Sequence, residues 1–154
     1  MKGMVIGIHI ASARAAPMQL VEEAHAVPGR GLEGDRYFDG GGTFSVPFPN
    51  PDSEVTLIEE ESLTVFNHEC RSSMLPANTH RNIVTRGVEL NNLVGREFRI
   101  GVVRFLGHGL CEPCDHLQKL TSEPVLTGLV GKGGLRAQVL TEGIFRLGDS
   151  IDTT

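Results

Sequence analysis

The sequence has little of what marks an exported, membrane-spanning or nucleic-acid-binding protein. Its 154 residues include three cysteines, an odd number that disfavours a disulfide scaffold and makes a reducing cytoplasm the expected location. No apolar run approaches the length of a membrane span. The formal net charge of −5 lacks the surplus of Lys and Arg that phosphate neutralisation needs, so we expect neither a membrane nor a nucleic-acid partner.

Length and composition predict one globular domain over residues 1–154. Hydrophobic residues make up 40% and charged residues 21% of the chain, proportions typical of globular rather than disordered proteins. The 19 glycines and 8 prolines favour short strands and tight turns over a helical bundle. Only three of the 14 basic residues are lysines, and arginine is the better residue for fork-like recognition of a phosphate.

The first 16 residues resemble a signal peptide, but their apolar run is short and contains Gly7 and His9, so we expect a strand there. Helices are expected over 56–71, with Thr56 as its cap, and over 113–120 after Pro113. The expected strands cover 5–11, 19–27, 82–85 and 102–106, followed by a hairpin of 135–140 with 143–147. Many short strands with a few short helices indicate a mainly β fold, a barrel or a sandwich.

Cys111 and Cys114, with His108 and His116 beside them, form the densest group of reactive side chains in the chain. One interpretation is a zinc site made of these four residues, or with His80 replacing one of them. Four ligands within nine residues are too crowded for the usual closed tetrahedral site, which disfavours this interpretation. A thioredoxin-like dithiol is disfavoured as well, because such a pair belongs early in a βαβ unit.

Two interpretations of the cysteines remain. Cys114 follows Pro113 at the expected start of a helix, where backbone N–H groups and the helix dipole favour a thiolate nucleophile. Protonated imidazoles at His108 or His116 would favour the thiolate further. Alternatively, both thiols fill core space, as we expect for Cys70 at the end of an apolar helix stripe.

Several motifs, taken in order, resemble the MOSC domain, the molybdenum cofactor sulfurase C-terminal domain. None of these motifs is specific alone, but together they extend over nearly the whole chain. The motifs are Gly-Leu-Glu-Gly-Asp-Arg-Tyr at 31–37, Arg-Asn-Ile-Val-Thr-Arg-Gly-Val at 81–88, Leu-Val-Gly-Arg-Glu-Phe-Arg-Ile-Gly at 93–101, Cys-Glu-Pro-Cys at 111–114, Gly-Gly-Leu-Arg-Ala-Gln-Val-Leu at 133–140 and Arg-Leu-Gly-Asp at 146–149.

The resemblance implies a MOSC-type β-barrel with a site around Cys114, which would accept sulfur as a persulfide or ligate molybdenum. Cys111 would be its resolving partner, and Asp35 would hold a structural turn. Each arginine of the site has an alternative role as a solvated strand residue. The residues that would hold the molybdenum cofactor, a molybdopterin, are Arg36, Arg81, Asn82, His116 and Arg136.

The function expected from the resemblance is therefore molybdenum-cofactor binding and sulfur carriage by Cys114. Sulfurases of the family join this domain to a portion that binds pyridoxal phosphate, which we do not expect here, so the desulfurase would be a separate partner, as would a molybdoenzyme. Whether the chain is itself an enzyme, as a sulfur transferase or a component of a molybdenum-dependent oxidoreductase, stays open. The alternatives are a non-catalytic ligand- or partner-binding barrel, and a molybdenum-dependent reductase of N-hydroxylated substrates that takes electrons from a separate donor.

Overall fold

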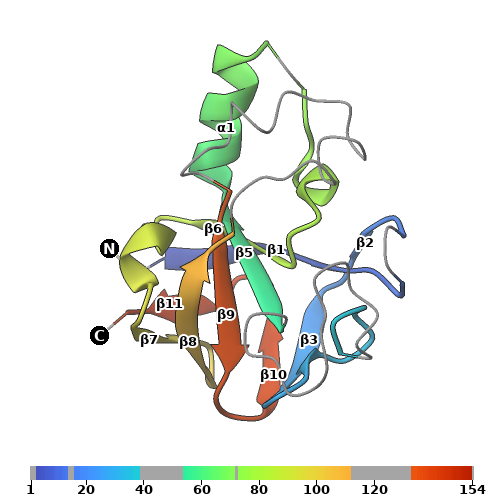
Figure 1. Ribbon diagram of the computed structural model, residues 1–154, viewed down its shortest axis with the longest axis vertical. Helices are drawn as coiled ribbons and strands as arrows, with labels where there is room; N and C mark the ends of the chain where they lie inside the picture. Colours follow the sequence, from blue (N-terminus) through green and yellow to red (C-terminus); the bar gives the residue numbers. More distant parts are fainter. Residues whose placement is uncertain (1–2, 14–15, 39–53, 72, 112–132, 154) are drawn as a thin grey trace.

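Strands dominate the computed structural model, which describes residues 3–13, 16–38, 54–71, 73–111 and 133–153 (Figure 1). Its helical elements are α1 (Glu60–Glu69) and the short 3-10 helices η2 (Pro76–Thr79) and η3 (Leu90–Leu93). The strands are β1 (Gly3–Ile10), β2 (Gln19–Leu20), β3 (Glu23–Val27), β4 (Gly31–Leu32), β5 (Val55–Glu59), β6 (Ile83–Arg86), β7 (Glu97–Ile100), β8 (Val103–Leu110), β9 (Leu135–Val139), β10 (Gly143–Arg146) and β11 (Ser150–Asp152).

Seven of these strands close into a barrel. They follow one another in the order β11, β7, β8, β9, β5, β6 and β1, and β1 pairs in turn with β11 through Gly3 and Ile151. All pairings in this ring are antiparallel except that of β5 with β6. β2 extends the sheet beyond β1, while β10, β3 and β4 form a separate three-stranded sheet. The mainly β fold and the β-barrel expected from the sequence are thus confirmed.

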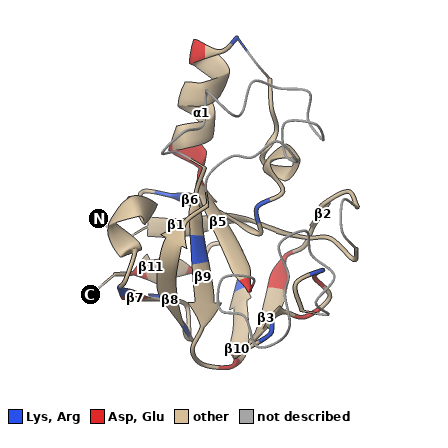
Figure 2. Ribbon diagram, viewed as in Figure 1, with Lys and Arg blue, Asp and Glu red and all other residues tan. Residues whose placement is uncertain are grey.

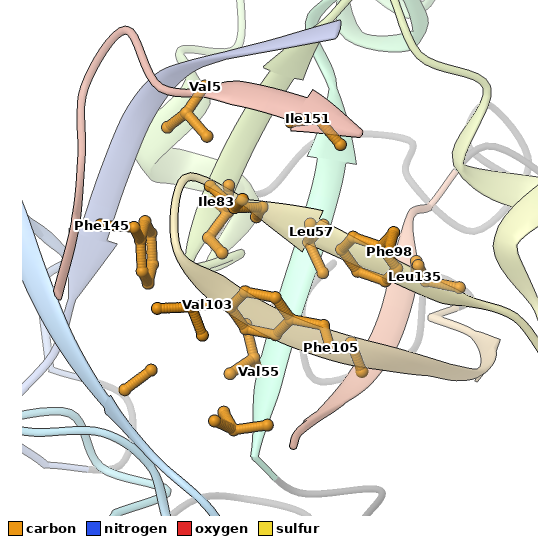
Figure 3. Packing of buried hydrophobic residues seen from close by; sticks show 14 of the residues in the cluster. Val5, Val55, Leu57, Ile83, Phe98, Val103, Phe105, Leu135, Phe145 and Ile151 are labelled. Atoms are coloured by element: carbon orange, nitrogen blue, oxygen red, sulfur yellow. The ribbon is translucent and has the colours of Figure 1, made fainter. Parts of the chain in front are cut away.

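The barrel interior is filled by alternate residues of its strands. Phe98 and Phe105 stack with ring centroids 5.4 Å apart, and Phe145 meets Phe105 edge-on at 5.9 Å (Figure 3). Phe145 comes from β10, so the smaller sheet contributes directly to the barrel core. Aromatic pairs in these geometries add to the stability that apolar burial provides.

The helix expected over 56–71 begins later than predicted, because its first residues form β5. The run Val55-Thr56-Leu57-Ile58 is buried throughout and lies between β6 and β9. A strand covered on both faces reads as a continuous apolar run, which sequence patterns do not separate from a helix start. The helix α1 therefore starts at Glu60, and Thr56 is not its cap.

α1 stands beyond one end of the barrel (Figure 1) and has a small apolar cluster of its own. This cluster consists of Leu63, Phe66 and Met74, with the partly buried Cys70 packed against it. Cys70 therefore contributes to packing, in the way that the apolar stripe of the sequence indicated. No helix in the described part of the chain is both long and apolar enough to cross a membrane.

The chain path at residues 135–147 also differs from the expected hairpin. β9 and β10 both form, but β9 pairs with β8 and β5, whereas β10 pairs with β3. The chain leaves the barrel between them and brings Phe145 into the core from the second sheet. The single strand expected over 19–27 is likewise two, β2 and β3, which pair with different partners. The helix expected over 113–120 lies outside the described residues.

Candidate functional site

Four polar residues on adjacent barrel strands form one row on the outer face of the barrel, which we call the outer row: His9, Asn82, Thr56 and Arg136. Residues that flank them, such as Ile8, belong to the core, and side chains alternate between the two faces of a strand. Thr56 and Arg136 are direct partners in the pairing of β5 with β9. The pairings of β1 and β5 with β6 place His9 and Thr56 on either side of Asn82, which directly precedes β6.

The side chain of Asn82, in the outer row, links three strands by hydrogen bonds. It is fully buried, and its Oδ1 accepts hydrogen bonds from the backbone N–H and the hydroxyl of Thr56, at 3.1 and 3.2 Å. Its Nδ2 donates to the carbonyl oxygen of His9 at 3.1 Å. The amide of Asn82 thus joins β5 to β1, and both of its polar atoms are already used within the protein.

Arg81 holds both ends of the segment that carries the Cys111-to-Cys114 motif. Its guanidinium donates to the carbonyl oxygens of Gly133 at 2.8 Å, Cys111 at 3.1 Å and Thr79 at 3.3 Å. The residue is 8% exposed, and among the described residues no carboxylate pairs with it. Carbonyl oxygens stabilise the guanidinium without cancelling its charge, so this position favours an anionic neighbour.

Asp35 and Arg36 form a second buried group. Unlike Arg81, Arg36 has a carboxylate partner, which is Asp35. The Arg36 guanidinium donates to Asp35 Oδ1 at 3.0 Å and to the carbonyl oxygen of His80 at 3.0 Å. Asp35 also accepts the backbone N–H groups of Ala11 and Tyr37. The pair ties the 31–37 loop to the end of β1 and to the turn before Arg81. This arrangement agrees with the structural turn expected for Asp35.

Arg136 is half-buried on β9, where Figure 2 shows a basic segment. Next to it on the outer face lie Glu54, Gln138 and His108, and Gln138 Oε1 is 2.8 Å from the Nε2 atom of His108. Glu54 is 1% exposed, accepts the Val139 N–H at 2.9 Å through Oε1, and has no hydrogen-bond partner for Oε2 among the described residues. Burial raises the pKa of the Glu54 carboxyl above its usual value.

Sequence reasoning did not identify His9 or Glu54 as site residues. His9 is 6% exposed, burial lowers the pKa of its imidazole, and Nδ1 has no hydrogen-bond partner within the described ranges. Perturbed titratable groups with unpaired polar atoms are frequent at functional sites. A polar residue inside the apolar start of the chain was a usable signal for His9, and an acidic residue directly before a buried strand was one for Glu54.

The structure describes only part of the cysteine motif. Cys111 follows the last residue of β8, is 2% exposed and is a free thiol. Its backbone N–H donates to Gly134 at 2.7 Å. Cys114 and His116 lie outside the described residues, so their predicted roles stay predictions. Within the ranges that the structure describes, no group of three His, Cys, Asp or Glu side chains could hold a metal ion.

The glycine directly before β9 allows the strands of the site to approach closely. Gly134 has a φ of +112°, and a Cβ atom there would overlap the carbonyl oxygen of Leu57. Only glycine fits such a position without a backbone shift. This contact brings the start of β9, and with it the carbonyls that bind Arg81 and Cys111, against β5.

Together these features define a small β-barrel domain with a buried polar site on the outside of the barrel. The family model described as the MOSC domain matches residues 32–152. The chain therefore belongs to the MOSC domain family, as the ordered motifs indicated.

Solved structures show the same fold at low sequence identity. The YuaD protein from Bacillus subtilis has a TM-score of 0.81 at 17% identity, over 98% of this chain and 94% of that one. YiiM from Geobacillus stearothermophilus gives 0.76 at 12% identity, over 99% and 75%. YiiM from Escherichia coli gives 0.73 at 19% identity, over 100% and 70%. No curated protein matches significantly in sequence.

Proposed function

We propose that this chain binds the molybdenum cofactor on the outer face of its barrel, with Cys114 supplying the thiolate that acts there. Membership of the MOSC domain family supports the association with this cofactor. The observation that carries the proposal is the buried Arg81 guanidinium, which has carbonyl partners but no carboxylate partner among the described residues. A buried cation of this kind suits the phosphate of a molybdopterin.

The donor set of the described site fits such a group. Arg136 is half-buried in the outer row, one strand from Thr56. Arg36 is 6% exposed but is neutralised by Asp35, so in this proposal it shapes the site while Arg81 and Arg136 attract the anion. Asn82 positions the strands, because its amide is used internally. When bound, the cofactor would supply a thiophilic metal centre.

Cys114 has two roles open to it in this proposal. As a sulfur carrier, its thiolate attacks the outer sulfur of a donor persulfide, so that a Cys114 persulfide forms and the donor leaves as a thiolate. As a ligand, the same thiolate would hold the molybdenum when the cofactor is bound. A pyridoxal-phosphate-dependent cysteine desulfurase is the proposed sulfur donor and a molybdoenzyme the proposed acceptor, in a reducing cytoplasm that keeps the thiols free.

Mass spectrometry of the full chain tests the carrier role. The protein is incubated with inorganic polysulfide, and the added sulfur is located by peptide mapping. We expect one added sulfur atom on Cys114, none in Cys114→Ser, and unchanged labelling in the matched control Cys70→Ser. Molybdenum content of freshly purified protein tests the ligand role in parallel. Absence of both the persulfide and molybdenum would contradict the proposal and favour a non-catalytic binding module.

A further inference from the structure

A cavity of about 380 Å³ lies outside the barrel, on the β1 side of the outer row. Its floor is the outer face of β1 and β6, represented by Ile6 and Val84, and η2 forms one wall with Pro76 and Ala77. Met18 and Leu20 also line the cavity. This volume is in the range of cavities that hold small molecules. Neither Arg81 nor Cys111, the residues around which the proposed function is built, lines this cavity.

Among the described residues, the cavity lining is apolar except for His9, the one polar side chain that they contribute. No hydrogen bond of the His9 imidazole is present within the described residues. Leu20 and Leu75, also in the lining, are 66% and 65% exposed. An apolar pocket with one well-placed polar group is the usual form of a small-molecule site.

The protonation state of His9 decides whether its imidazole donates or accepts a hydrogen bond in the cavity. Burial lowers the pKa of the imidazole, so the ring is neutral and carries one proton. Nδ1 is fully buried without a partner in the described part of the chain, and a buried N–H without an acceptor is rarer than a bare lone pair. We therefore assign the proton to Nε2, the ring nitrogen that remains for a ligand, and this makes His9 a hydrogen-bond donor.

We propose that this cavity is a binding site for a compact apolar molecule that carries one acceptor oxygen, which bonds to Nε2 of His9. The apolar walls bury the body of the ligand and favour binding through the hydrophobic effect. The His9 imidazole selects for the acceptor, because a buried donor left unpaired disfavours a ligand that lacks one. The cavity shares His9 with the outer row, but neither Arg81 nor Arg136 lines it, and its test does not require the cofactor.

Two probes of almost the same shape test this assignment. Acetophenone and ethylbenzene share a phenyl ring and a two-carbon chain, and only acetophenone carries an acceptor oxygen. Binding of each is followed by NMR titration of the full chain, with expected shifts at the amides of Leu20, Ala77 and Val84. We expect acetophenone to bind more tightly, and His9→Leu to reduce its advantage over ethylbenzene by roughly fivefold.

A second variant removes the cavity without touching His9. Ala77→Trp places a large side chain from η2 into the space, and we expect it to abolish binding of both probes while polysulfide labelling of Cys114 stays as in the wild type. Failure of the cofactor proposal and failure of this one are thereby distinguished. Absence of probe binding to the wild type, unchanged probe binding in Ala77→Trp, or equal preference in wild type and His9→Leu would overturn the proposal.

Discussion

The two faces of β5 and β9 are built in different ways. On the inner face, Val55, Leu57 and Ala137 belong to the apolar core. On the outer face of the same strands, Thr56 is 2% exposed and lies beside the half-buried Arg136. Both faces are covered, but one is held by apolar packing and the other by hydrogen bonds. The candidate site thus lies on the outer face of the same strands whose inner face forms the core.

This difference has consequences for how each face responds to substitution. Loss of apolar volume from the inner face removes burial energy and leaves a cavity. Loss of one polar partner on the outer face leaves the other partner buried and unpaired, at the cost of its desolvation.

The largest effect is expected where β9 crosses β5. Gly134→Ala places a Cβ atom on top of the Leu57 carbonyl oxygen at a φ of +112°, so we expect a loss of about 5 kcal/mol or no folded protein. The matched control is Gly109→Ala, since a Cβ atom at Gly109 would meet no described residue within 4 Å apart from its chain neighbours. Urea denaturation should show Gly109→Ala within about 1 kcal/mol of the wild type. Equal stability of the two variants would contradict the close approach.

On the inner face, Phe105→Ala removes a fully buried ring that contacts both Phe98 and Phe145. The expected loss in the free energy of unfolding is about 3–5 kcal/mol. Phe105→Leu, which keeps most of the volume, should lose less. Urea denaturation of both variants measures the difference, and the prediction is wrong if alanine and leucine cost the same.

On the outer face, Asn82→Ala leaves the N–H and hydroxyl of Thr56 and the carbonyl of His9 without their side-chain partner. We expect a loss of about 2–3 kcal/mol in the free energy of unfolding. Asn92 is a control of the same residue type, because its side chain bonds to Glu89 at the exposed surface. Asn92→Ala should lose less than about 0.5 kcal/mol in the same experiment, and a similar loss in both variants would refute the role given to Asn82.

The smallest effect concerns the pH dependence contributed by Glu54. Burial raises the pKa of this carboxyl in the folded protein above the reference value of 4.5. As pH rises above 4.5, the unfolded chain loses its proton first, so ionisation favours the unfolded state until the folded pKa is passed. Glu54→Gln cannot titrate, and its stability relative to the wild type should therefore increase with pH. Urea denaturation at pH 4.5 and at about pH 8 measures this difference; a constant difference would contradict the account.

Sequence patterns predicted the inner face of the barrel better than the outer one. The short apolar runs at 5–11 and 102–106, the many glycines and prolines, and the ordered motifs led to the mainly β fold. β5 was missed, since a strand covered on both faces has no period of two residues. The hairpin of β9 with β10 was wrong because strand pairing depends on where Phe145 packs, which is a long-range contact.

The candidate site, like the fold, was predicted only in part. Arg81, Asn82 and Arg136 were chosen from motifs. The structure places Asn82 and Arg136 in the outer row and Arg81 beside it, against the carbonyl oxygens of Gly133 and Cys111. Which of them positions strands and which is left to attract an anion was not predictable, because these roles depend on which carbonyl oxygens lie within reach of each side chain. His9 and Glu54 come from segments distant in sequence, and only the pairing of β1, β6, β5 and β9 brings them to one face.

The central claim is that the outer face binds the molybdenum cofactor, and molybdenum content measured on two arginine variants tests it most directly. Arg136→Gln removes the half-buried charge of the outer row, whereas Arg104→Gln removes an exposed charge that pairs with Glu97 on the neighbouring strand. After production in cells that make the cofactor, we expect the wild type and Arg104→Gln to retain molybdenum equally and Arg136→Gln to retain about tenfold less, as loss of one charge-assisted contact implies. Equal retention in both variants, or none in the wild type, would contradict the claim.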